Sequence, residues 1–83
     1  MELEKFRFIT FASEAEAIQR EIKATNDANF NDGVTVKYAN IIKKFDEDLW
    51  LIPVLLDFEF LFSSTELDGS IWLTETQIYG EII

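Results

Sequence analysis

One segment of this chain has the pattern of an amphipathic helix, and most other segments alternate apolar and polar residues as β-strands do. The helical segment is 13–25, where Ser13 is the expected N-cap and Glu16 completes a capping box. Glu16 and Arg20 are expected to pair across one helical turn. A narrow apolar stripe is expected along this helix, formed by Ala15, Ile18 and Ile22. The composition of 26–33 predicts a loop after the helix.

The alternating segments predict a mostly antiparallel sheet. Segment 3–11 places apolar residues on both of its faces, which predicts a strand inside the sheet. Further strands are expected at 34–45, 49–54, 55–62 and 71–73. Pro53 has no N–H to donate to a neighbouring strand, so its own strand is expected to lie at an edge or to end there.

The C-terminal tail has two interpretations. Thr74 and Gln77 can cap a short helical turn that Gly80 closes, or 77–83 can form an edge strand. The order is then roughly β-α-β-β-β-β, which predicts the α+β class, with a single helix packed on a mostly antiparallel sheet. We expect one domain over residues 1–83. It comprises a β-α-β-β core over 1–54 and an acidic, aromatic-rich extension over 55–83.

Cysteine and histidine are absent from the sequence. Their absence excludes disulfides, thiol catalysis, zinc sites built from these residues and triads with a histidine base. The Asx-rich segment 27–31 matches only the beginning of a calcium-binding loop, because the glycine and glutamate that must follow it are misplaced or missing. We interpret Asp57 with Glu59, and the acidic turn 46–48, as solvated surface. We therefore predict no catalytic, metal or cofactor site and no enzymatic activity.

The net charge of −9 comes entirely from one half of the chain. Residues 1–44 contain all seven basic residues and seven acidic ones, whereas residues 45–83 contain nine acids and no base. This charge disfavours direct binding of nucleic acid, which requires lysine and arginine at the phosphates. The acids either keep a hydrophobic domain soluble or form a surface that meets a basic partner.

The acidic half is also rich in aromatic residues, more of them than one helix-covered sheet face is expected to bury. Aromatic side chains set among acids suit protein association. We expect Phe58 in the core, and Trp72 and Tyr79 at an interface. Contacts with a partner are predicted for Glu66, Asp68, Trp72, Glu75 and Tyr79.

Several short motifs lie between residues 8 and 53. They are the sequence FITF at 8–11, an acidic, alanine-containing helix over 14–22, the step Tyr38-Ala39, and Trp50 with Pro53 three residues later. With these motifs the segment resembles a group of short phage and prophage proteins, often encoded among structural and tail genes. The group has no well-established activity. The resemblance therefore implies a location in the host cytoplasm or in a virion, but no mechanism.

Two functions remain open. The first is a small acidic interaction module without catalysis, a structural or accessory phage protein that binds a virion protein or a second copy of itself. The alternative is an inhibitor that mimics nucleic acid in the basic cleft of a host nuclease or defence protein. Salt would weaken only the second kind of binding steeply. No membrane partner is expected, because the most apolar stretch, 49–62, is short and contains two acids.

Overall fold

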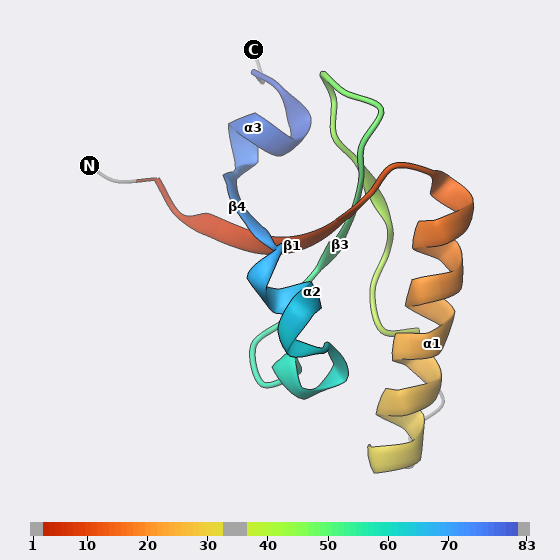
Figure 1. The fold of residues 1–83 in the computed structure, drawn as a ribbon. Coiled ribbons are helices and arrows are strands. Elements are labelled where there is room, and N and C mark those ends of the chain that lie inside the picture. Colours follow the sequence, from red (N-terminus) through yellow and green to blue (C-terminus); the bar gives the residue numbers. More distant parts are fainter. Residues whose placement is uncertain (1–2, 33–36, 82–83) are drawn as a thin grey trace.

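Strand β1 (Lys5–Phe11) lies inside the sheet, as predicted. The computed structural model of the protein describes residues 3–32 and 37–81. β1 pairs antiparallel with β3 (Trp50–Pro53) on one side and with β4 (Ile71–Thr74) on the other. The short strand β2 (Ile42–Lys43) pairs antiparallel with β3, so the strand order is β2-β3-β1-β4 (Figure 1). The predicted α+β class with an antiparallel sheet is confirmed.

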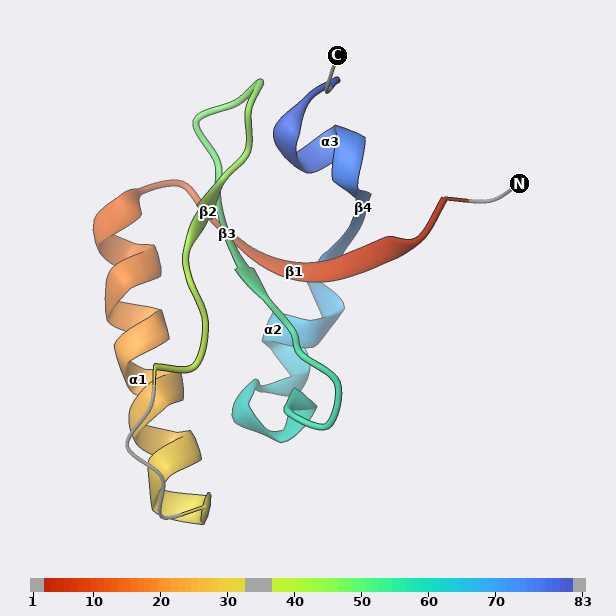
Figure 2. The ribbon, with the colours of Figure 1, turned by 180° about the vertical axis from the view of Figure 1, so that it is seen from behind.

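Alternation along β1 places a hydrophobic core on each face of the sheet. Ile9 packs with Ile52 and with the alanines of α1 (Glu14–Asp32) on one face. The opposite face is covered in part by α3 (Glu75–Tyr79), and its core consists of Phe8, Leu51, Leu73 and Ile78. Figure 2 shows the two helices on different sides of the sheet. The expectation of a single packed helix is therefore incomplete.

Helix α1 contacts the sheet through small side chains. The hydroxyl of Ser13 accepts a hydrogen bond from the Glu16 N–H at 3.2 Å, which confirms the predicted N-cap. The predicted apolar stripe is wrong, because Ile18 and Ile22 are exposed. The face turned toward the sheet instead carries the buried residues Ala17, Glu21, Ala24 and Ala28. This buried face continues past residue 25, so α1 extends through most of the segment predicted as a loop.

The predicted hairpin of 34–45 and 49–54 is present in a shorter form. β2 has two residues, and the Lys44 N–H donates to the Leu49 carbonyl at 2.9 Å to close the turn. β3 ends at Pro53, as the missing N–H predicted. The beginning of the first hairpin strand, 34–36, and the final tail residues, 82–83, lie outside the described residues.

The predicted strand 55–62 is wrong. The chain makes a turn in which the Phe58 N–H donates to the Leu55 carbonyl at 3.0 Å, and it then forms a 3-10 helix, η1 (Glu59–Leu61). Leu61 and Phe62 are consecutive in sequence, yet both are buried in the core that packs against α1. Consecutive side chains of a strand point to opposite faces, so a strand would not have placed both of them in this one core.

The segment between the strands predicted at 55–62 and 71–73 contains a helix that was not predicted from the sequence. Helix α2 (Ser64–Asp68) has a complete capping box, in which the Ser63 hydroxyl and the Glu66 carboxylate each accept a backbone N–H of the other residue. Ser63 and Glu66 have the spacing that predicts such a box. Therefore the element was visible in the sequence and was missed.

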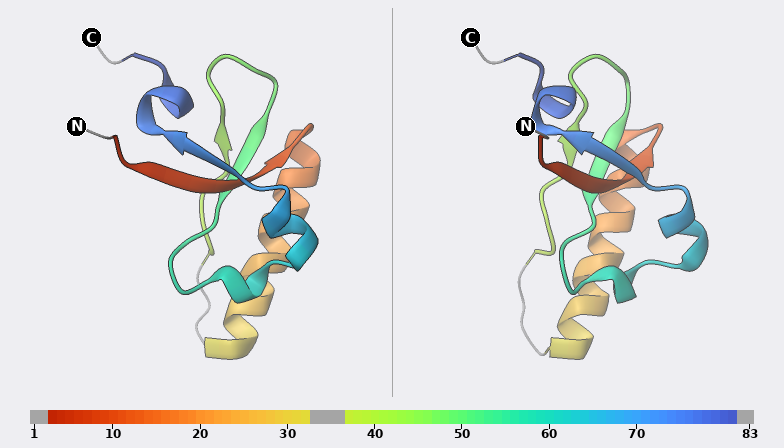
Figure 3. Two further views of the ribbon diagram at one scale, coloured as in Figure 1. Left: turned by 60° about the vertical axis from the view of Figure 1, so that its left-hand side comes forward. Right: turned by 90° about the vertical axis from the view of Figure 1, so that its left-hand side faces the viewer.

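The tail forms the helical turn, the first of its two interpretations. The Thr74 N–H donates to Gln77 Oε1 at 2.8 Å, and the Gln77 N–H donates to Thr74 Oγ1 at 3.3 Å. Gly80 follows α3, and its N–H donates to the Thr76 carbonyl at 2.8 Å. We call residues 43–49 the hairpin tip. The Phe45 N–H in this tip donates to the Ile78 carbonyl at 3.1 Å, so the tip and α3 lie together at one end of the sheet (Figure 3).

Candidate interaction surfaces

The five residues predicted to contact a partner do not form one patch. Glu66 and Asp68 belong to α2, Trp72 to β4, and Glu75 and Tyr79 to α3, so they are distributed along and beyond β4. Four of them are exposed at the surface, whereas Glu66 is bound within the protein. Their contact with a partner stays a prediction.

Glu66 connects α2 to α1 through Arg20. Arg20 Nε donates to Glu66 Oε2 at 2.7 Å, and Arg20 Nη2 donates to Glu66 Oε1 at 3.0 Å and to the Leu61 carbonyl at 2.7 Å. The guanidinium carbon lies 4.8 Å from the centroid of the Phe62 ring. The predicted pairing of Arg20 with Glu16 is wrong, because this guanidinium binds across to α2 and η1. The hydrogen bond from Arg20 lowers the pKa of Glu66 to about 2.

Replacing Glu66 by glutamine is expected to lower the free energy of unfolding by about 1–2 kcal/mol at neutral pH. Glutamine can keep the capping box, but it removes the charge opposite Arg20. The Glu66 pKa is about 2 in the folded protein, against an ordinary value of 4.5. Its stabilisation is therefore complete above about pH 4.5 and is lost as the pH falls toward about 2. Urea unfolding between these pH values measures the effect.

The matched control for this prediction is Asp68→Asn, which changes the same charge at an exposed position of the same helix. Its stability should stay within about 0.5 kcal/mol of the parent protein. A constant difference between the parent and Glu66→Gln from neutral pH down to about pH 2 would show that the ion pair with Arg20 does not stabilise the fold.

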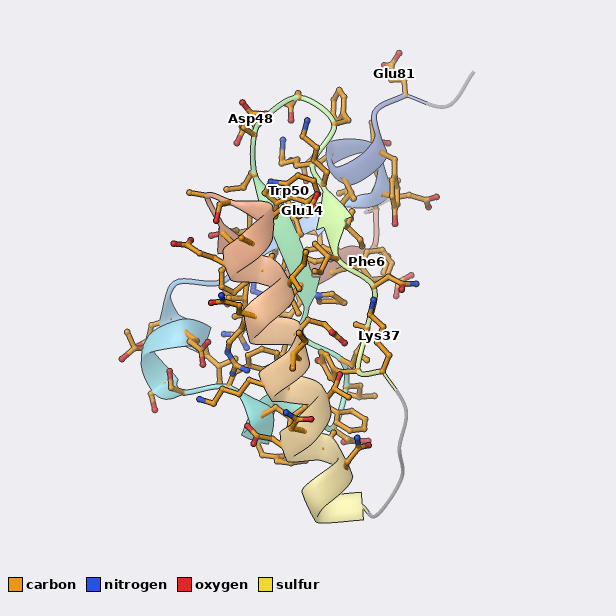
Figure 4. The ribbon with its side chains drawn as sticks, turned by 90° about the vertical axis from the view of Figure 1, so that its right-hand side faces the viewer. Phe6, Glu14, Lys37, Asp48, Trp50 and Glu81 are labelled. Carbon is orange, nitrogen blue, oxygen red and sulfur yellow. The ribbon has the colours of Figure 1, made fainter. Side chains whose placement is uncertain are left out.

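Several acids of the acidic half are neutralised within the hairpin tip. Lys44 Nζ donates to Asp46 and lies 3.7 Å from Glu47, while Lys43 Nζ lies 3.6 Å from Asp48. The hydrogen bond from Lys44 to Asp46 raises the pKa of the Lys44 ammonium and lowers the pKa of the Asp46 carboxyl. Figure 4 shows Asp48 at this end of the molecule together with Glu81. Five acids of this half form no ion pair with any described residue: Asp57, Glu59, Asp68, Glu75 and Glu81.

Segment 55–60, which we call the apolar turn, exposes large apolar side chains beside unpaired acids. Leu56 is 82% exposed and Phe60 is 58% exposed. Asp57, between them, has a φ of 69°, in the left-handed region that aspartate tolerates better than most residues. The apolar turn lies at the end of the sheet opposite the hairpin tip (Figure 1). Such a turn can insert apolar side chains into a partner.

Tyr38 fixes the backbone at the start of the apolar turn. Its hydroxyl accepts the Leu55 N–H at 2.9 Å and donates to the Pro53 carbonyl at 2.8 Å. The ring of Phe58 contacts the Tyr38 ring edge-on, with 5.8 Å between the ring centroids. Phe58 is therefore partly buried against the core, as expected from the sequence. The turn has an anchored backbone and solvent-exposed side chains.

A groove of about 300 Å³ separates the beginning of β1 from α3. We call it the β1–α3 groove. Phe6 and Leu3 provide apolar surface, and Glu4 and Glu75 provide a carboxylate from each of the two sides. The remaining lining residues are Thr74, Thr76 and Gly80. Sequence reasoning selected Glu75 but missed the other residues, because only the pairing of β1 with β4 brings the two segments together.

The outer edge of β4 offers little to an added strand. The Arg7 carbonyl accepts the Val54 N–H at 2.9 Å, so the backbone groups of Arg7 point away from β4. Trp72 pairs with Arg7 across the two strands, and its own N–H and carbonyl therefore point outward, away from β1. On either side, the Ser70 N–H donates to the Leu67 carbonyl and the Thr74 N–H donates to the Gln77 side chain. At this edge, extension of the sheet by a partner strand is therefore confined to Trp72.

No known protein family, curated protein or solved structure matches this chain. In residues 3–32 and 37–81, no group of acidic side chains is arranged to bind a metal ion. The Asx positions 27–31 lie on helix α1, so the loop considered for calcium is not a loop. No helix in the described part of the chain has the length and apolar character to cross a membrane.

Proposed function

We propose that this protein is a small acidic protein–protein interaction module without catalysis, and that it binds its partner through the apolar turn. The observation that carries this proposal is the exposure of Leu56 and Phe60 on a turn whose backbone is anchored by Tyr38. Asp57 and Glu59 lie beside them and form no ion pair with any described residue. The partner surface that fits is an apolar pocket bordered by lysine or arginine.

The resemblance of residues 8–53 to short phage and prophage proteins supports a virion or tail protein as this partner. The apolar turn lies in the extension 55–83, beyond the segment that carries this resemblance. We propose that residues 8–53 form the common scaffold, and that the turn supplies a contact particular to this protein.

Mimicry of nucleic acid is the weaker candidate. A mimic needs a continuous row of unpaired carboxylates, whereas Asp46, Glu47, Asp48 and Glu66 are all in ion pairs with lysine or arginine. The unpaired acids of this half are divided among the apolar turn, α2, α3 and Glu81 beyond α3. This distribution favours an apolar contact flanked by acids and disfavours a surface that mimics the phosphates of nucleic acid.

The test is capture of partners by the tagged protein from cells that carry its source phage or prophage. Washes at about 0.1 M and about 1 M salt change the screening length from about 10 Å to about 3 Å. We expect a virion protein to remain at high salt, and Leu56→Ser to weaken its binding about tenfold, because a buried leucine contributes about 1.5–3 kcal/mol. Binding to the identified partner is then measured by calorimetry.

The matched control is Ile22→Ser, which removes an apolar side chain of similar size from the outer surface of α1, where Ile22 is about half exposed. It should leave the affinity unchanged. Equal affinity for Leu56→Ser and the parent protein would exclude the apolar turn. Capture of a host nucleic-acid enzyme at low salt, with its loss at high salt, would overturn the proposed module and support an inhibitor that mimics nucleic acid.

A further inference from the structure

We propose that the β1–α3 groove is a second binding site, and that it takes an arginine or lysine side chain which a partner protein presents beside an apolar residue. This site is separate from the apolar turn, because α3, which forms one side of the groove, lies at the opposite end of the sheet from segment 55–60 (Figure 3). The apolar surface of the groove, its two carboxylates and the charge of the whole chain support this proposal.

The apolar surface belongs to a sheet face that α3 covers only in part. On this face Phe8 and Leu73 are buried, whereas Phe6 is 42% exposed although it pairs directly with Leu73. Leu3, at the beginning of the described chain, is also exposed beside it. The hydrocarbon part of an arginine or lysine side chain can lie on such a surface, and its cation can contact the aromatic ring.

The charge of the groove has one sign. Glu4, which directly precedes β1, and Glu75 of α3 approach the groove from its two sides. Neither forms an ion pair with a described residue. No lysine or arginine is among the lining residues. Lys5 and Arg7 alternate with Phe6 along β1, so they belong to the opposite face of the sheet. Two carboxylates next to apolar walls favour a cation.

A second copy of this chain does not fit the groove well. Each copy has a net charge of −9, and the apolar turn, its most exposed apolar segment, carries Asp57 and Glu59. Inserting that turn between Glu4 and Glu75 would bring like charges together. The complementary occupant is therefore a basic segment of a different protein.

The probe for this site is a capped peptide with the sequence leucine-arginine-leucine, titrated into the ¹⁵N-labelled protein and followed by NMR. We expect chemical-shift changes at the amides of Phe6, Thr76 and Gly80. The same peptide with glutamine in place of arginine should leave them unchanged. Raising the salt from about 0.05 M to about 0.5 M should weaken the binding, because the contact is exposed and charge-driven.

Charge variants separate the groove from the overall charge of the protein. The double variant Glu4→Gln, Glu75→Gln should raise the peptide Kd about three- to tenfold, as expected for two exposed charge contacts. The control Glu14→Gln, Asp68→Asn removes the same charge at exposed positions of α1 and α2 and should change the Kd less than about twofold. Equal effects of both double variants, equal binding of the glutamine peptide, or no localised shifts would each overturn the proposal.

The peptide titration reports on the groove alone, and the capture experiment with Leu56→Ser reports on the apolar turn alone. Loss of one result therefore leaves the other standing. One combination of results would leave the apolar turn as the binding surface. The peptide would cause no shifts in the groove, and the double variant Glu4→Gln, Glu75→Gln would bind the captured partner as tightly as the parent protein does.

Discussion

Replacing Gly80 by alanine is expected to lower the free energy of unfolding by about 1–3 kcal/mol. Gly80 has a φ of 83° and a ψ of 177°, a combination that is almost restricted to glycine. A Cβ atom at this position would lie 3.1 Å from Cδ2 of Phe45, closer than ordinary van der Waals contact. Both effects act where the hairpin tip packs against α3. Guanidinium unfolding measures the change as a lower midpoint with an unchanged slope.

Two further variants identify the cause of this loss. Gly69→Ala is the matched control, because Gly69 has a φ of −86° and an added Cβ would meet its nearest atom at 3.6 Å. It should be neutral or slightly stabilising. Adding Phe45→Ala to Gly80→Ala removes the contact and leaves the backbone strain. If Gly80→Ala is as stable as the parent protein, the conformation after α3 is not the one described.

Replacing Tyr38 by phenylalanine is expected to lower the free energy of unfolding by about 2–3 kcal/mol. The Tyr38 hydroxyl bonds both the Leu55 N–H and the Pro53 carbonyl, so its removal leaves two backbone groups without this partner. The surrounding aromatic packing with Phe58 and Phe62 should survive, because the ring is kept. The Leu55 amide should exchange its hydrogen faster, which shows that the apolar turn has lost its anchor.

The free energy of unfolding of the parent protein and of Tyr38→Phe, measured against pH, gives an independent test of the Tyr38 hydroxyl. Burial raises the pKa of Tyr38 above its ordinary value of 10.0, so the neutral phenol is favoured in the folded state. Its stabilisation is therefore complete below about pH 10 and is lost as the pH rises above that value. Tyr38→Phe should lack this alkaline loss. The exposed Tyr79→Phe is the control and should stay within about 0.5 kcal/mol of the parent protein.

Tyr38 also shows how the apolar turn depends on long-range contacts. Tyr38 precedes the apolar turn by 17 residues, and its hydroxyl nevertheless determines where that turn begins. A period-2 pattern in 55–62 favoured a strand. Instead, Tyr38 and Arg20 donate to the Pro53 and Leu61 carbonyls, and the Leu55 N–H donates to the Tyr38 hydroxyl. No local pattern in the sequence contains these partners, so the apolar turn could not be predicted.

The β1–α3 groove has the same origin. Glu75 was selected as a contact residue from its position in the acidic half, but nothing near it in the sequence points to Phe6. The antiparallel pairing of Lys5 with Thr74 and of Phe6 with Leu73 brings the two ends of the chain together. The sum of charges along the sequence also gave an incomplete description of the acidic half. Lys43, Lys44 and Arg20 neutralise several of its acids, although all three lie in the other half of the chain.

The sequence by itself determined the features that depend on neighbouring residues. The two-sided strand β1, the N-cap at Ser13 and the end of β3 at Pro53 all follow from short-range hydrogen bonding and steric limits. The same limits offered the capped turn from Thr74 to Gly80 as one of two interpretations of the tail. The tertiary structure alone decided which face of α1 is buried, because alanines allow the helix to approach the sheet more closely than isoleucines would. It also decided which side chains remain exposed, since exposure depends on the space that distant segments leave uncovered.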